Sequence, residues 1–378
     1  EVFEETGIIV QFESIISLGH FYPHQFHKSN LYILCTATPK SYEINIQDSH
    51  EIIDAKWVDV YEYINVEDVL VVNNNASAVF LILNTFAKDQ EVIVSRGELV
   101  EIGGSFRIPE VMKQSGAKLV EVGATNKTKI TDYANAINEN TVMLMKVHQS
   151  NFSIEGFSED VAYENLKLLA DQNNLLDYYD LGSGYVPKLP YNLGNREHSL
   201  SEILECSPSL ISFSGDKLFG SVQAGIIAGR KELIARLKKN QLLRMLRVDK
   251  ITLALLEESI KAYLKEEYEN LPTLWLLFQN VDTLKQRALH VKKCIGEEAC
   301  DVVMSETYMG GGTLPNRKFP TVALHVKGKA TFLEKRFREH RVIGRIENDR
   351  FLLDFRALLP HNEAALITIT RTILGLEV

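Results

Sequence analysis

The feature that most constrains this 378-residue chain is an alternation of short apolar runs with amphipathic helical stretches between Val71 and about Asn270. Each apolar run has the length of a strand, and each stretch that follows repeats its apolar residues at helical spacing. This order favours a mostly parallel sheet with right-handed crossovers in an α/β domain. The expected strands are Glu91–Ser95, Lys118–Val122, Val142–Val147, Leu176–Asp180, Leu210–Ser214 and Ala224–Ala228, and the expected helices include Ala76–Phe86, Ile108–Gln114, Tyr163–Asn173 and Lys231–Lys238.

The segments on either side of this region have different patterns. The N-terminal part holds short apolar runs between turns, such as Gly7–Phe12 and Leu31–Ala37. The C-terminal part combines a long helical stretch with short strands and a final helix, which indicates a small α+β domain. We therefore expect an N-terminal segment at residues 1–70, a large domain at 71–271 and a small C-terminal domain at 272–378.

Composition narrows the functional classes. The chain is 45% hydrophobic and 24% charged, as in ordinary globular proteins, and its formal net charge is −9. Overall acidity does not favour nucleic-acid binding, although it is compatible with a local basic patch. No apolar run has the length of a membrane span, so we expect no membrane partner. The cysteines lack C-x-x-C spacing and indicate reduced thiols in a cytoplasmic protein: Cys35, Cys206, Cys294 and Cys300.

A lysine follows one of the expected strands in the segment Ser209–Gly225, SLISFSGDKLFGSVQAG. Open α/β sheets bind ligands at such strand ends. Lys217 can form a Schiff base with an aldehyde cofactor there, and Ser212 and Ser214 can hold phosphate oxygens nearby. The alternative interpretation is a solvated surface lysine, the more common situation for this residue type.

An aspartate ends the preceding strand, in the stretch LDYYDLGSG. A partly buried carboxylate needs a positive partner, and the protonated pyridine nitrogen of pyridoxal phosphate (PLP) is one. The alternative is that Asp180 caps a helix or a turn. Its position, one strand-end loop before Lys217, favours the PLP interpretation.

Polar residues follow two further strands. The stretch VVNNNASAV places Asn74, Asn75 and Ala76 at the start of an expected helix, where asparagine is a good cap and phosphate is attracted. His148 and Asn151, in KVHQSNF, are candidates to contact the cofactor ring or its hydroxyl. The alternatives are a simple helix cap and a structural histidine.

The longer motifs carry a family resemblance. The chain is similar to bacterial selenocysteine synthase, L-seryl-tRNA(Sec) selenium transferase, densely from Val71 to about Trp275 and more weakly to the C-terminus. Stretches this long are specific. The resemblance implies a fold-type I PLP transferase and a large cytoplasmic homo-oligomer. The motifs include VVNNNASAV, VSRGELVEIGGSFRIPEVMKQSGAKLVEVGATNKT, NENTVMLMKVHQSNF, YDLGSG, FSGDKLFG, LLRMLRVDKITLALLE, MGGGTLP and RVIGRIENDRFLLDFRAL.

The resemblance also implies a reaction. The family converts seryl-tRNA(Sec) to selenocysteinyl-tRNA(Sec) with selenophosphate as the selenium donor. By resemblance, Lys217 holds PLP and Asp180 pairs with its pyridine nitrogen. The seryl amine would displace Lys217, the Cα proton and the β-hydroxyl would leave, and the resulting aminoacrylate would accept selenium. PLP stabilises the carbanion, while the protein orients the groups and transfers protons.

Two arginines in LLRMLRVDK, Arg244 and Arg247, match family arginines expected to bind the anionic donor. Their spacing predicts that both lie on one helical face, which suits a phosphate-like oxyanion. The surrounding segment Arg230–Lys250 holds eight Lys or Arg and two acidic residues, which predicts a patch facing tRNA or the donor. A solvated basic helix is the alternative.

The N-terminal segment departs from the family. Family members carry a tRNA-recognition domain and an LHTNLGR-like motif before the NNNA motif, and neither precedes Val71. The first residues, EVFEETGI, instead resemble the second half of a Nudix box, with Glu1 as the base and Glu4 and Glu5 as ligands of a cation such as Mg²⁺. Because the first half of the box is missing, an acidic helix end is favoured over a working hydrolase. We interpret the segment as a truncated Nudix-like remnant in a fragment or fusion.

Four functions remain open at this point. The resemblance favours a PLP-dependent selenium transferase acting on seryl-tRNA(Sec). The absence of a tRNA-recognition domain favours a PLP lyase or transferase acting on a small amino acid, because one fold supports several chemistries. The half Nudix box leaves a nucleotide pyrophosphohydrolase open, and the incomplete junction leaves an inactive fusion fragment open.

Overall fold

The computed structural model describes residues 9–21, 30–41, 43–45, 67–102, 106–194, 198–310, 312–314 and 316–376. The chain divides into two compact units, Glu1–Ile64 and Asn65–Val378. In the first unit, the described residues include an antiparallel pair of strands, β1 (Val10–Phe21) and β2 (Asn30–Pro39). The proposed Nudix residues lie outside the described residues: Glu1, Glu4 and Glu5.

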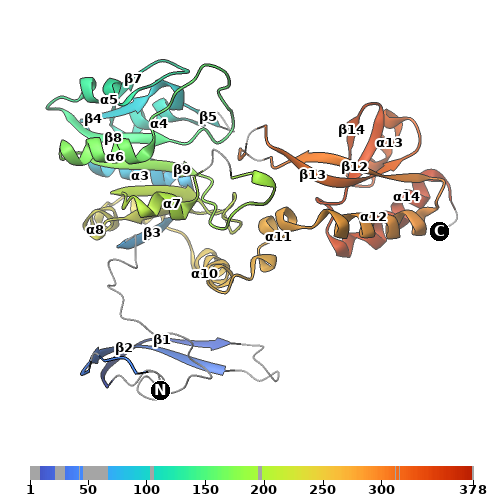
Figure 1. Ribbon diagram of the computed structural model, residues 1–378, viewed down its shortest axis with the longest axis horizontal. Helices are drawn as coiled ribbons and strands as arrows, with labels where there is room; N and C mark the ends of the chain where they lie inside the picture. The colour runs from blue at the N-terminus through green and yellow to red at the C-terminus, as the bar shows by residue number, and fades with distance from the viewer. Residues whose placement is uncertain are drawn as a thin grey trace. The chain divides into compact units, whose positions relative to one another are not determined.

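The second unit is built on a seven-stranded sheet with the order β3-β11-β10-β9-β8-β4-β7. Figure 1 labels β3, β9, β8, β4 and β7 of this sheet. Among these seven strands, β11 alone runs antiparallel to its neighbours, so the predicted mostly parallel α/β sheet is confirmed. The strands are β3 (Asp68–Val72), β4 (Glu91–Ser95), β7 (Lys118–Val122), β8 (Thr141–Val147), β9 (Leu176–Gly182), β10 (Leu210–Ser214) and β11 (Gly225–Gly229).

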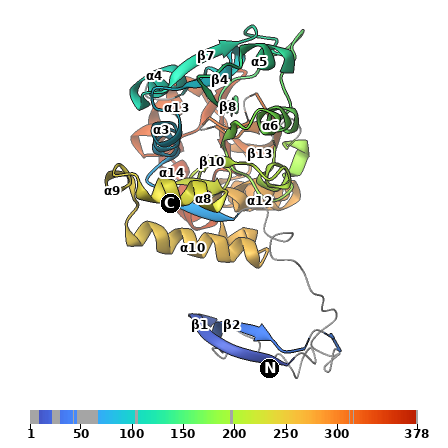
Figure 2. The ribbon, with the colours of Figure 1, turned by 90° about the vertical axis from the view of Figure 1, so that its left-hand side faces the viewer.

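Helices cover both faces of this sheet (Figure 2). Because helices cover both faces, the central strands are buried along nearly their whole length, and every residue of β10 is buried. One face packs against α3 (Asn75–Phe86), α4 (Ile108–Ser115) and α8 (Lys231–Lys239). The other face packs against α5 (Ile130–Ala136), α6 (Tyr163–Gln172), α7 (Leu200–Glu205) and α10 (Lys250–Leu264).

The first strand of the sheet begins earlier than the sequence pattern indicates. β3 pairs with β11 from Asp68 through Val72, so the sheet takes in residues that the expected boundary after residue 70 assigned to the N-terminal segment. The apolar run of β3 is too short for its start to be read from periodicity.

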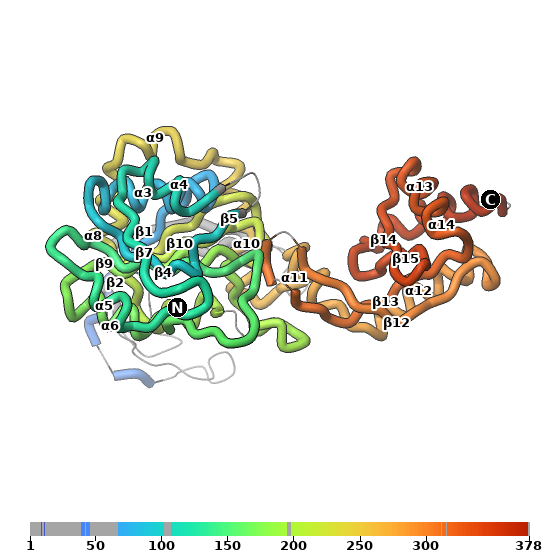
Figure 3. The backbone as a smooth tube through the Cα atoms, turned by 90° about the horizontal axis from the view of Figure 1, so that it is seen from above, coloured from blue at the N-terminus to red at the C-terminus, as the bar shows by residue number. Residues whose placement is uncertain are grey.

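The C-terminal part contains an antiparallel sheet with the order β12-β13-β15-β14 (Figure 3). Its own core packs three helices against these strands. The elements are α11 (Pro272–Phe278), α12 (Val281–Ile295), β12 (Cys300–Tyr308), β13 (Lys318–Val326), α13 (Ala330–Glu339), β14 (Arg345–Glu347), β15 (Arg350–Asp354) and α14 (Glu363–Leu374). Across the described residues, no helix is both long and apolar enough to cross a membrane.

Candidate active site

The parallel strands of the large sheet end at one edge, where open α/β sheets bind ligands. Asn74 and Asn75 follow β3, His148 follows β8, Asp180 lies near the end of β9, and Lys217 follows β10. These strands share one direction, so the sheet brings the side chains expected from the sequence to the same edge. This edge is the candidate cofactor site.

Asp180 is the best-defined group at this edge. Its side chain is almost fully buried, with 7% exposed, and its Oδ1 accepts a hydrogen bond of 2.8 Å from Nδ2 of Asn75. The backbone N–H of His148 donates to the carbonyl of Asp180 at 2.9 Å. Burial raises the pKa of Asp180, and the hydrogen bond from Asn75 and the charges of Lys217 and His148 oppose that shift. A buried carboxyl with a raised pKa is stabilised in its ionised form when a cationic ligand lies beside it.

Lys217 is half-buried in the short loop between β10 and β11. The two residues after it, Leu218 and Phe219, are buried in two different apolar clusters and anchor the loop. A glycine is required at position 215, because a Cβ there would lie 2.5 Å from the carbonyl oxygen of Val222. Packing on both sides thus fixes the backbone of Lys217 at the sheet edge.

The start of α3 supplies a second part of the site. Asn74 caps this helix, because its Oδ1 accepts from the N–H of Ser77 at 2.8 Å. Asn75 and Ala76 form the first turn, and the N–H groups of a first turn favour an anion such as phosphate. Oδ1 of Asn75 is buried and has no hydrogen-bond partner in the described structure. A buried polar atom of this kind is typically satisfied by a ligand.

Gly225 of β11 allows the start of α3 to reach this position. A Cβ at Gly225 would lie 2.2 Å from the carbonyl oxygen of Asn74 and 2.9 Å from the backbone nitrogen of Asn75. We expect Gly225→Ala to displace this turn, at a cost of roughly 1–3 kcal/mol in stability, and to weaken PLP binding. Urea unfolding and a PLP titration measure the two effects. Unchanged PLP affinity in a destabilised variant would show that the turn does not hold the cofactor.

Three other residues expected at the site lie in different surroundings. Ser212 is fully buried within β10, and its hydroxyl shares a hydrogen bond of 2.7 Å with the hydroxyl of Tyr178. Ser214 is buried at the end of the same strand. Asn151 is exposed and donates from Nδ2 to the carbonyl of Glu101 at 2.8 Å. The described structure shows no hydrogen bond from the side chains of these three residues to the side chain of Asp180 or Lys217, although Ser212 is the strand partner of Asp180 in the β9–β10 pair.

The prediction that Arg244 and Arg247 share one helical face is wrong. Arg244 lies in α9 (Leu243–Leu246), but Arg247 ends this short helix with extended backbone angles. The cause is tertiary: Arg247 forms an isolated antiparallel bridge with Val72 at the end of β3. Both side chains are exposed. The bridge places the backbone of Arg247 close to the start of α3.

The basic segment Arg230–Lys250 is partly used within the fold. Nζ of Lys238 forms an ion pair of 2.7 Å with Asp68, and the guanidinium of Arg236 lies 4.5 Å from the ring centroid of Phe86. These cations connect α8 to β3 and to α3. The exposed cations that show no ion pair among the described residues are Lys231, Lys239, Arg244, Arg247 and Lys250.

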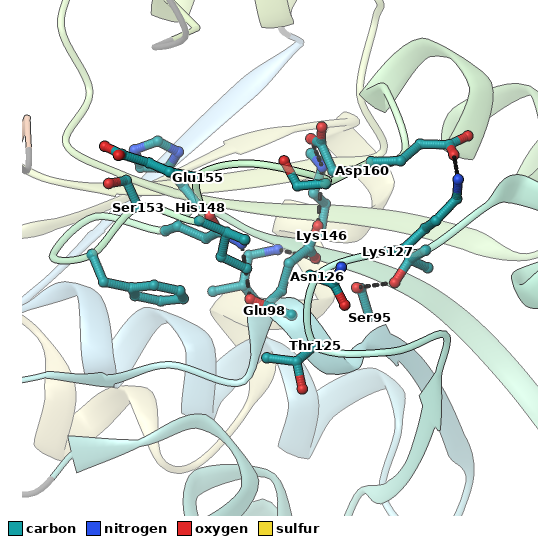
Figure 4. Close-up of a pocket in the computed structure, with 18 of the residues that line it drawn as sticks. Ser95, Glu98, Thr125, Asn126, Lys127, Lys146, His148, Ser153, Glu155 and Asp160 are labelled. Atoms are coloured by element: carbon teal, nitrogen blue, oxygen red, sulfur yellow. Dashed lines mark hydrogen bonds and ion pairs between the residues drawn. The ribbon is translucent and has the colours of Figure 1, made fainter.

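A cavity of about 500 Å³ adjoins the same sheet edge, and sequence reasoning did not identify it (Figure 4). His148 and Gln149 line it from the end of β8, and Ser95 lines it from the end of β4. Asn316 and Arg317 line it from the loop before β13. These residues are too far apart in the sequence to form a motif, so no spacing signal predicts the cavity.

A buried ion pair forms one wall of this cavity. Nζ of Lys146 lies 3.0 Å from Oε1 of Glu98 and 3.5 Å from Asp160, and it donates to the carbonyl of Val161 at 2.8 Å. Oε2 of Glu98 accepts from the N–H of Val147 at 3.0 Å. Burial raises the pKa of Glu98, and the Lys146 ammonium opposes this. Burial lowers the pKa of Lys146, but the two carboxylates outweigh it and the net shift is upward.

This pair offers a stability test. Because Lys146 and Glu98 are both at least nine-tenths buried, Lys146→Met leaves an uncompensated carboxylate and is expected to cost roughly 3–5 kcal/mol. The double variant Lys146→Met with Glu98→Leu removes both charges and is expected to recover much of that loss. Urea unfolding of the two variants measures the difference. A double variant no more stable than the single one would contradict this account.

The chain has the mostly parallel α/β fold of the fold-type I PLP enzymes, which is the class of protein that its sheet and helices define. The chain belongs to the L-seryl-tRNA selenium transferase family, whose model matches residues 32–359. The family and enzyme class predicted from the sequence are confirmed. The match begins inside the segment 1–70, which the sequence analysis assigned to a Nudix-like remnant.

Close relatives carry the same family name. The L-seryl-tRNA(Sec) selenium transferase of Nautilia profundicola is 61% identical over 312 residues, which is 82% of this chain and 70% of that protein. The one of Aliarcobacter butzleri is 63% identical over 297 residues, which is 78% of this chain and 66% of that protein. The chain thus spans about two thirds of the length of these relatives.

A solved structure supports the fold alone. D-Glucosaminate-6-phosphate ammonia-lyase superposes with a TM-score of 0.59 at 18% identity, and the match covers 84% of each chain. At this identity the similarity shows the architecture and does not indicate a shared substrate.

Proposed function

We propose that this chain binds PLP through Lys217 and converts the seryl group of seryl-tRNA(Sec) to selenocysteinyl with selenophosphate. The observation that carries the proposal is the arrangement of Lys217, Asp180 and the start of α3 at one sheet edge of a chain from this family. The residues present fit PLP: an amine, a buried carboxyl and a helix start with an unsatisfied buried oxygen.

Bound PLP supplies an electron sink for a negative charge at Cα. The chain's own residues supply position and proton transfer. Nζ of Lys217 would hold the cofactor aldehyde and would take the Cα proton of the seryl group. Asp180 would keep the ring nitrogen protonated, and its hydrogen bond to Asn75 fixes the carboxyl next to the start of α3, which would hold the phosphate.

The exposed basic residues support a role with anionic ligands. We assign Arg244 and Arg247 to the selenium donor, because the bridge of Arg247 to Val72 places that segment beside the start of α3. A guanidinium suits a phosphate-like oxyanion through paired N–H donors. We assign the remaining exposed cations of α8 and α10 to contacts with the tRNA backbone: Lys231, Lys239 and Lys250.

The deciding experiment is an absorbance spectrum of the purified protein with added PLP, before and after borohydride reduction. A Schiff base gives a visible band that reduction removes, and mass spectrometry then locates the label on the peptide that carries Lys217. A protein that stays colourless in excess PLP, or a label on another lysine, would refute the proposal.

Retention of tRNA(Sec) tests the substrate. Binding that weakens with salt supports the tRNA assignment, because neutralised phosphates release counterions. A coloured protein that does not retain tRNA(Sec) would indicate instead a PLP lyase or transferase acting on a small amino acid.

Other parts of the sequence prediction stay proposals. These are the homo-oligomer, the cytoplasmic location and the Nudix-like remnant with its Mg²⁺ ligands Glu1, Glu4 and Glu5. Among the described residues, no group of His, Cys, Asp or Glu is arranged to hold a metal ion. Calorimetric titration with Mg²⁺, compared with a Glu5→Gln variant, tests the metal site.

A further inference from the structure

The cavity beside the candidate active site is the strongest feature that the proposed function leaves unused. It has a volume of about 500 Å³, which lies within the range of small-ligand sites. Five parts of the large domain and the loop before β13 line it. Nδ2 of Asn316 in that loop donates to Oγ of Ser153 at 3.1 Å and ties the loop to the cavity wall.

The cavity adjoins the cofactor edge. His148 and Tyr179 both line it, and both are in direct contact with the backbone of Asp180: His148 through the 2.9 Å hydrogen bond, and Tyr179 as its neighbour in β9. The cavity therefore reaches the backbone of Asp180 at the cofactor edge, while the Asp180 side chain points to the opposite face of the sheet from Tyr179, toward Asn75.

Most of the charged side chains in the cavity wall form ion pairs with one another. Lys146 is paired with Glu98, and Lys127 forms an ion pair of 2.9 Å with Glu159. Figure 4 labels Lys146, Glu98 and Lys127 among the residues that line the cavity. Two of the three lining cations already have carboxylate partners, and the lining holds four carboxylates, so the wall is poorly suited to a phosphate and better suited to a neutral, polar ligand.

The uncharged residues that line the cavity indicate which kind of neutral ligand it could bind. Phe152 offers an aromatic ring, and Thr125 and Asn126 offer a hydroxyl and an amide. Aromatic rings stack on nucleobases, and hydroxyl and amide groups hydrogen-bond to bases and ribose. In an aminoacyl-tRNA, the serine is esterified directly to the ribose of the terminal adenosine. A reaction on the seryl group therefore brings a nucleoside close to the reacting carbon, where a neighbouring pocket can bind it.

We propose that this cavity binds the terminal adenosine of the aminoacyl-tRNA, with Phe152 packing against the base. The inference rests on the proposed function, because it assumes that a seryl ester reacts at the Lys217 edge. It adds a binding site for the end of the substrate that is separate from the exposed basic residues assigned to the tRNA backbone.

The test compares two probes on the whole chain loaded with PLP. One is L-serine methyl ester, and the other is 3′-deoxy-3′-(L-serylamino)adenosine, in which a stable amide replaces the ester. The absorbance change of the bound cofactor reports the affinity of each. We expect the adenosine probe to bind at least about tenfold more tightly, as one base-stacking contact would provide.

Two variants test whether the tighter binding of the adenosine probe comes from this cavity. Thr125→Trp fills the cavity and is expected to abolish the gain while leaving the affinity for serine methyl ester unchanged. Asn126→Ala is a smaller change and is expected to reduce the gain in affinity of the adenosine probe. The test therefore still works if Thr125→Trp does not fold. Leu168→Trp on the exposed side of α6 is the matched control and should keep the full gain.

The possible outcomes distinguish failure of the adenosine-site proposal from failure of the proposed function. If serine methyl ester changes the spectrum and the adenosine probe binds no more tightly, this inference is overturned and the proposed function stands. A gain that survives in both Thr125→Trp and Asn126→Ala overturns it as well. If neither probe changes the spectrum, the proposed function fails and this inference fails with it.

Discussion

Replacing Lys217 by alanine is expected to abolish the visible band of the PLP-loaded protein and to lower selenium transfer by at least about a thousandfold. The expected loss is large because the proposed function assigns two tasks to this one amine: holding the cofactor aldehyde and taking the Cα proton. The fold should tolerate the change, because the buried anchors of the loop are the neighbouring Leu218 and Phe219. The spectrum with added PLP and a single-turnover transfer assay measure the two losses.

A second lysine provides the control for this variant. Lys113 is exposed on α4 and shows no ion pair in the described part of the chain, so Lys113→Ala removes an equal charge away from the sheet edge. It should leave the band and the transfer rate unchanged. A yellow Lys217→Ala protein that borohydride still reduces would show that another amine carries the cofactor.

The central strands could be predicted from the sequence because both of their faces are buried. The expected ranges Glu91–Ser95 and Leu210–Ser214 agree with the central strands β4 and β10. The range Lys118–Val122 agrees with β7, an edge strand that is partly exposed. A strand buried on both sides is a continuous apolar run between polar turns, and such runs have sharp ends. The order of strands along the sheet then made Asp180 and Lys217 neighbours, because β9 and β10 pair in parallel.

The parts that could not be predicted depend on contacts between distant segments. The helix expected around Arg247 ends early because that residue pairs with Val72. The hydrogen bond between Asn75 and Asp180 joins residues on two elements that are not adjacent in the chain. Lys146 and Glu98 form an ion pair, but they are far apart in the sequence. From the sequence alone, each of these charged residues is expected to be exposed to solvent. Tertiary structure overrides local preference in each case.

Asp180→Asn is expected to have opposite effects on the unloaded protein and on catalysis. Burial raises the pKa of Asp180 above its unfolded value, so its contribution to stability is present at low pH and is lost as the pH rises through the folded pKa. An amide cannot ionise, so without PLP the variant should melt at a higher temperature than the wild type at neutral pH. With PLP the order should reverse, because only the carboxylate pairs with a ring cation.

The transfer rate should fall by about a hundredfold or more in the same variant, because an amide cannot hold the ring nitrogen protonated. Thermal unfolding with and without PLP across a pH series measures the stability effects, and a transfer assay measures the rate. Asp171→Asn, at an exposed carboxylate on α6, is the control and should follow the wild type in both conditions. If PLP raises the melting temperature of Asp180→Asn as much as that of the wild type, the carboxyl does not face the cofactor. The buried acid would then be a structural hydrogen-bond acceptor for Asn75 alone.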